Sequence, residues 1–137
     1  MVDAVSIALS GLMAQSQRLA ASASNIANAG TTGVLPTGES PASTVYRPLS
    51  VSTIALTAGT GMGGGVRAEV TSDPDGYSPV YDPSSVYANN EGLVAAPNVD
   101  LTREIVNLIE IKSLFKANLS VIKTYDKMMG ELLDTIT

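Results

Sequence analysis

Apolar residues at the start of the chain recur at alternating three- and four-residue steps, interrupted only by Ser16. They are Val2, Val5, Leu9, Leu12, Leu19, Ala23 and Ile26. This heptad spacing is typical of a helix that packs lengthwise against other helices. We therefore predict a helix over about residues 3–28, with small residues in its last third that suit a crowded bundle. It should end at Asn28-Ala29-Gly30, with Gly30 in the left-handed conformation.

A second apolar segment runs from about residue 101 to residue 136 and predicts another long helix. Either Asn98 or Asp100 could serve as its N-cap. At about 100° per residue its apolar positions cover more than half of the circumference. A simple two-helix hairpin would leave part of that surface exposed, so either other protein copies or the central region must cover the excess.

The central region, from Val45 to Val94, shows short strand patterns separated by turns. Val66, Ala68 and Val70 alternate with charged residues, which is typical of a half-buried strand. Residues 50–57 and 77–81 also favour strands, the second at an edge because Pro79 has no amide hydrogen to donate. Turn sequences occur at residues 73–76 and 82–83, on either side of the 77–81 strand. We expect two or three hairpins in a small, partly open β region.

These patterns predict an α+β fold in which long N- and C-terminal helices pack as a coiled-coil-like bundle, with a small central β-hairpin region between them in the chain. The expected boundaries are 1–30, 31–97 and 98–137. Only 4% of the residues are aromatic, so any core must consist of aliphatic side chains and alanine. The residues expected to pack between subunits are Val5, Leu9, Leu12, Leu19, Ile26, Ile105, Leu108, Phe115, Leu119 and Ile122.

The charge and composition exclude several classes of protein. A net charge of −5 and a pI near 4.5 disfavour a nucleic-acid partner, which requires a basic surface. The chain has no cysteine or histidine, which removes disulfides, thiolate nucleophiles, Ser-His-Asp triads and the usual zinc ligands. We therefore expect no catalytic residues, no metal site and no cofactor.

Two further patterns have ordinary explanations. Residues 59–64 match G-x-G-x-x-G, but a strand follows them where a dinucleotide site requires a helix, so we expect a hairpin tip. The second pattern is a set of four lysines that would form one ridge of the final helix, which predicts a solvated face or, alternatively, an acidic docking site. They are Lys112, Lys116, Lys123 and Lys127.

The chain shows no sign of a membrane segment or a Sec signal. No stretch approaches the roughly 20 apolar residues of a membrane span. The first basic residue is Arg18, and Asp3 precedes it, so the positive region of a signal peptide is missing. If the protein leaves the cytoplasm, we expect it to use another route.

The segment Ser24–Thr31, SNIANAGT, resembles the S-N-[IL]-A-N-x-x-T signature near the N-terminus of bacterial flagellar axial proteins. The preceding ALSGL at residues 8–12 is similar to their opening helix, although Val34 replaces an aromatic residue of many relatives. Within these proteins, the chain length and several later segments are most similar to the proximal rod proteins of the basal body. Those segments are YR at 46–47, GVR at 65–67, YDP at 81–83, AAPNVDL at 95–101 and KANLSVIKT at 116–124.

This resemblance implies a structural subunit that assembles helically through its terminal helices and transmits torque as part of the rod. It also implies partners among copies of the chain and other rod, hook-basal-body and export-gate proteins. The location would be the periplasm-spanning basal body, reached through the flagellar type III apparatus. Ser24, Asn25, Asn28 and Thr31 match the motif, and we expect them to end the first helix and satisfy its last carbonyls.

Two alternatives remain at this point: another axial subunit, such as a different rod or hook-type protein, or a small non-enzymatic helical binding module. A module would form a closed bundle with its own β region, whereas a rod subunit should have frayed terminal helices when isolated.

Overall fold

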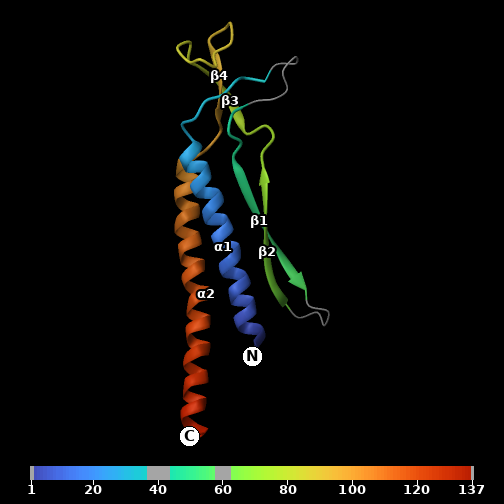
Figure 1. The fold of residues 1–137 in the computed structure, drawn as a ribbon, viewed down its shortest axis with the longest axis vertical. Helices are drawn as coiled ribbons and strands as arrows, with labels where there is room; N and C mark the ends of the chain where they lie inside the picture. The colour runs from blue at the N-terminus through green and yellow to red at the C-terminus, as the bar shows by residue number, and fades with distance from the viewer. Residues whose placement is uncertain (1, 37–43, 58–62, 137) are drawn as a thin grey trace. The chain divides into compact units, whose positions relative to one another are not determined.

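The computed structural model describes residues 2–36, 44–57 and 63–136. The chain begins with a long helix, α1 (Val2–Asn28), continues through four strands and ends with a second long helix, α2 (Leu101–Ile136) (Figure 1). The strands are β1 (Leu49–Thr57), β2 (Gly63–Ser72), β3 (Tyr77–Tyr81) and β4 (Leu93–Pro97). The α+β class and both predicted helices are thereby confirmed.

The end of α1 differs in one respect from the prediction. The helix does end at Asn28, but Gly30 does not adopt the left-handed conformation; among the described glycines only Gly65 and Gly92 have positive φ. Thr31 instead turns back on the helix, and both its amide and its hydroxyl donate to the Asn28 carbonyl, at 3.1 and 2.8 Å. A right-handed turn closed by Thr31 therefore ends the helix without a left-handed residue.

The start of α2 is capped by Asp100. Its Oδ1 accepts hydrogen bonds from the amides of Thr102 and Arg103, at 2.9 and 3.1 Å. These are amides that have no partner within the helix, so an aspartate directly before the first turn stabilises it. Asn98, the other candidate, lies outside the helix, and its backbone N–H donates to the Gly76 carbonyl at 2.9 Å.

The strands form two two-stranded sheets, β1 with β2 and β3 with β4. The three strands predicted at 50–57, 66–70 and 77–81 are confirmed, but the alternation in β2 stops at Val70, which is 46% exposed. Strand β4 was not predicted, and it pairs antiparallel with β3 so that Pro79 lies opposite Ala95. The predicted hairpin tip at residues 59–64 lies mostly outside the described residues.

The chain divides into two compact units. The first comprises Met1–Ala20, Val51–Glu69 and Asn107–Thr137. In it, α1 and α2 run antiparallel: Arg18 pairs with Glu110, and Gly11 lies against Asn118 (Figure 1). In this register α2 reaches the start of α1 at about Met128, so residues 128–136 extend beyond the end of its partner helix.

The second unit comprises Ala21–Ser50 and Val70–Val106 and contains the most deeply buried side chains. Val94 and Ala95 of β4 have no exposed surface. Gly33 forms a bridge to Ala95 with two backbone hydrogen bonds of 2.9 Å, on the side of β4 away from β3. This strand is therefore paired on both edges.

Buried apolar side chains are few, and most of them are alanine or valine. In the described part of the chain they are Ala8, Ala14, Ala21, Val45, Val94, Ala95 and Ile111. This agrees with the expectation that aliphatic side chains and alanine form the core. Neither α1 nor α2, as far as they are described, combines the length and apolar character needed to cross a membrane.

Candidate assembly surface

The face of α1 that contacts α2 is not its apolar heptad. Helix α1 carries a second heptad, made of small and polar residues, that is shifted by one residue toward the N-terminus from the apolar heptad. Its members are Ala8, Gly11, Gln15, Arg18, Ser22 and Asn25. All of these are buried except Arg18, which is half-buried. Since one helical residue corresponds to a rotation of about 100°, the two heptads lie on different faces.

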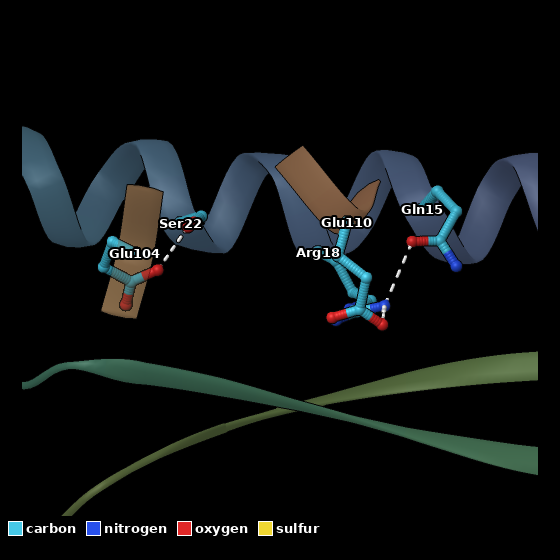
Figure 2. Close-up of polar contacts among 5 residues, drawn as sticks. All are labelled: Gln15, Arg18, Ser22, Glu104 and Glu110. Atoms are coloured by element: carbon cyan, nitrogen blue, oxygen red, sulfur yellow. Dashed lines mark hydrogen bonds and ion pairs between the residues drawn. The ribbon is translucent and has the colours of Figure 1, made fainter. Parts of the chain in front are cut away.

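In the first unit this small and polar heptad meets α2 through an ion pair and a close backbone approach. Arg18 Nη2 lies 3.1 Å from Glu110 Oε2, and its Nη1 also donates to Gln15 Oε1 at 3.2 Å (Figure 2). A Cβ atom on Gly11 would lie only 2.7 Å from Asn118 Oδ1. A small residue at this position lets the helices come close together.

In the second unit Asn25 is the centre of a buried polar cluster. Its Nδ2 donates to the Leu49 carbonyl at 2.9 Å and to Glu104 Oε1 at 2.7 Å. Its Oδ1 accepts from the Leu49 amide at 2.7 Å and from the Tyr46 hydroxyl at 2.8 Å. Every hydrogen-bonding position of the Asn25 amide is therefore occupied, although the residue is only 2% exposed.

Ser22 joins the same cluster from one turn earlier in α1. Its hydroxyl donates to Glu104 Oε2 (Figure 2). The other oxygen of that carboxylate accepts from Asn25. We call Ser22, Asn25, Tyr46, Leu49 and Glu104 the Asn25 cluster. It connects the last turns of α1 to the start of β1 and to the first turn of α2.

The four motif residues have different contacts. Asn28 donates from Nδ2 to the Ser24 carbonyl at 2.9 Å, and Thr31 binds the Asn28 carbonyl, so these two lie on the last carbonyls of α1. The Ser24 hydroxyl lies 3.0 Å from the Tyr46 hydroxyl. Asn25 contacts β1 and α2 instead of the carbonyls of its own helix.

The predicted packing residues of α1 lie at its accessible side. Leu9 is 45% exposed and Leu19 48% exposed. The other three, Val5, Leu12 and Ile26, are half-buried. The apolar heptad is thus only partly covered within the chain, because the small and polar heptad occupies the contact with α2.

The apolar surface of α2 is more open still. Ile105 is 56% exposed, Ile109 65% and Phe115 38%. Leu108, Leu119 and Ile122, the remaining predicted positions, are half-buried. Large exposed apolar patches mark surfaces that bind other proteins or membranes.

A groove of about 420 Å³ lies between α1 and α2 in the first unit. We call it the lysine-rimmed groove, and its walls are formed by Leu19, Leu108, Ile111, Lys112, Phe115, Lys116 and Leu119. All four lysines of the predicted ridge are exposed. Two of them, Lys112 and Lys116, border this groove.

The small and polar heptad was not predicted from the sequence, and neither were the contacts of Gln15, Ser22, Tyr46 and Glu104. The sequence does carry a signal for the heptad, since its residues recur at alternating three- and four-residue steps. Helix contacts are usually recognised by large apolar side chains, and this heptad has none.

Comparison with known proteins assigns this arrangement to a family. A family model described as flagella basal body rod protein matches residues 6–33, and one described as the flagellar basal body rod FlgEFG protein C-terminal region matches residues 90–135. The flagellar basal-body rod protein FlgC of Yersinia enterocolitica is 40% identical, over 93% of this chain and 91% of its own length. The chain belongs to the FlgC family of flagellar basal-body rod proteins.

The similarity extends to distant bacteria. FlgC of Escherichia coli O157:H7 is 38% identical over 93% of this chain and 91% of its own length. FlgC of Bacillus subtilis strain 168 is 30% identical over 95% of this chain and 94% of its own length. This FlgC-family chain is a structural subunit of the flagellar basal-body rod. The two family models match residues of α1 and α2, and these are the helices with the exposed apolar side chains.

Proposed function

We propose that this FlgC-family chain assembles helically through its terminal helices and forms part of the proximal drive shaft that transmits torque. Its partners would be copies of itself and neighbouring rod, hook-basal-body and export-gate proteins, and the chain would have a structural and not a catalytic role. The observation that carries this proposal is the partly exposed apolar heptad of α1 together with the exposed apolar side chains of α2.

Simple energetics support assembly by these faces. Burying apolar surface contributes about 25 cal/mol per Å², so a row of leucine and isoleucine side chains on each helix provides a driving force even after ordering costs. When a face on one copy binds a different face on the next and the rotation between copies does not close a ring, such contacts generate open helical assemblies. Helices packed lengthwise also resist twisting.

We propose in addition that the chain reaches the rod through the flagellar type III export apparatus. Family membership supports this route, and so does the small core, in which Val94 is the largest fully buried side chain among the described residues. A chain with few large buried side chains needs little free energy to unfold for passage through a narrow channel.

The proposal predicts that Ile109→Asp abolishes rod incorporation and swimming in a flagellated strain that depends on this chain. Ile109 is 65% exposed, so a carboxylate there is tolerated by the monomer but cannot enter an apolar contact between subunits. Ile109→Val, which keeps an apolar side chain at the same exposed position, is the matched control and should leave swimming intact. Full motility of the Ile109→Asp strain would show that this face is not used.

A further inference from the structure

We propose that the lysine-rimmed groove of one copy receives the end of α2 from a second copy. We call residues 128–136 the α2 tail. This inference rests on the proposed function and makes it more specific, because it names the two surfaces that meet.

The groove has the character of a site for an amphipathic helix with carboxylates along one side. Its walls are aliphatic and aromatic apart from Lys112 and Lys116. These two lie four residues apart, so both ammonium groups follow the same ridge of α2 and border one edge of the groove. Neither lysine has a hydrogen bond or ion pair with another residue in the described part of the chain.

The α2 tail supplies the apolar half of this match. In the first unit it extends beyond the start of α1, so α1 cannot cover it. Met128 is 48% exposed, Leu132 49% and Leu133 61%. Met128 and Leu132 are one turn apart and present a short apolar row along the helix.

The acidic residues of the α2 tail complement the lysines of the groove. The tail contains Glu131 and Asp134 and no basic residue. Glu131 lies 3.8 Å from Lys127, but both side chains are more than two-thirds exposed, and such a surface pair is weak enough to exchange partners. The last turn of α2 has no basic residue, so nearby cations would also stabilise the negative end of its helix dipole.

The dimensions of the two surfaces agree. At about 1.5 Å per residue, the groove segment from Leu108 to Leu119 is roughly 17 Å long and the tail roughly 12 Å. Groove and tail are different surfaces, so each copy can give a tail and receive one. This contact is therefore of the heterologous kind, which can repeat from copy to copy along a growing rod.

The first test is disulfide cross-linking between two full-length variants, Phe115→Cys and Leu132→Cys, mixed at high concentration under mild oxidation. The chain has no natural cysteine, so a disulfide between positions 115 and 132 joins two copies. Position 115 is in the groove and position 132 is at the middle of the tail. We identify this heterodimer by its linked peptides. We expect its yield to be at least five times the yield obtained when a Ser113→Cys control replaces Phe115→Cys in the mixture. An equal yield would overturn the proposal.

The second test reverses the charges on the two surfaces separately. Adding Lys112→Glu and Lys116→Glu to the Phe115→Cys chain should lower the cross-linking yield roughly fivefold to tenfold. Adding Glu131→Lys and Asp134→Lys to the Leu132→Cys chain should restore it. Lys123→Glu with Lys127→Glu in the Phe115→Cys chain is the matched control, because these lysines do not border the groove. Failure of restoration would overturn the tail as the occupant.

Failure of this proposal can be distinguished from failure of the proposed function. If the cross-link is absent while the unmodified chain still supports swimming in a strain lacking its own FlgC, the groove has another occupant and the rod function stands. If Ile109→Asp also leaves swimming unchanged, assembly through the exposed α2 face fails as well.

Discussion

Gly65, at the start of β2, occupies a position that only glycine suits. Its φ is +95°, in the region that other residues rarely adopt, and an added Cβ would collide with the Ser10 hydroxyl. That hydroxyl accepts a hydrogen bond from the Val66 amide at 3.0 Å and donates to the Ile7 carbonyl at 2.7 Å. One side chain of α1 thus determines where the backbone of β2 comes into contact with the helix.

We expect Gly65→Ala to lower the free energy of unfolding by about 2 kcal/mol, from the strained φ and the collision together. Gly63→Ala is the control, because a Cβ there meets nothing within 4 Å and the φ of Gly63 is not positive. Urea denaturation followed by circular dichroism measures both. Equal stability of the two variants would show that β2 can shift away from Ser10 at no cost.

At the scale of the elements, the Asn25 cluster joins three of them with side-chain hydrogen bonds. The end of α1, the first residue of β1 and the first turn of α2 all have a partner in it. Because Ser22 and Asn25 are buried and their partners are half-buried, loss of these hydrogen bonds would be costly. The cluster therefore specifies which elements meet, whereas apolar contacts alone would tolerate a slip of register.

We predict that Asn25→Ala destabilises the protein by about 2 to 3 kcal/mol, because the Leu49 amide and carbonyl and the Glu104 carboxylate lose buried partners. Glu110→Ala is a useful comparison. Its carboxylate pairs with Arg18 but is 54% exposed, so its removal should cost less than about 1 kcal/mol. Thermal unfolding of the two variants would test this order, and a larger effect at Glu110 would contradict it.

At the scale of the whole molecule, burial is unevenly distributed along the chain. The second unit contains the fully buried β4 residues Val94 and Ala95 and the Asn25 cluster. The α2 tail, in the first unit, extends beyond the start of α1 and exposes Met128, Leu132 and Leu133. Helices owe most of their stability to packing, so these parts should differ in local stability.

Hydrogen exchange on the dilute monomer should show this difference. We expect amides of β4 and of residues 21–25 to exchange slowest and those of the α2 tail to exchange fastest, near the rate of an unstructured peptide. Mass spectrometry of peptide fragments gives the measurement. If the amides of residues 5–26 and 105–133 were all strongly protected from exchange at low protein concentration, the terminal helices would already be ordered before assembly. That result would contradict the proposal that assembly orders them.

Local features of the sequence were sufficient for much of this fold. The periodicity of apolar residues predicted both helices, Asp100 was one of two predicted caps, and three of the four strands followed from alternation and turn residues. The motif at residues 24–31 was sufficient to indicate the family. Each of these signals depends on residues close together in the chain, whose conformational preferences and covalent spacing act without a distant partner.

Other features depended on contacts between distant segments. Strand β4 exists because β3 and Gly33 supply its hydrogen-bonding partners, and the role of Asn25 depends on Tyr46, Leu49 and Glu104. Two heptads on α1 had the same period, and only antiparallel pairing with α2 selected the small and polar one for the contact inside the chain. Periodicity defines the faces of a helix but not the partner of each face, because that choice depends on how closely two particular surfaces can approach.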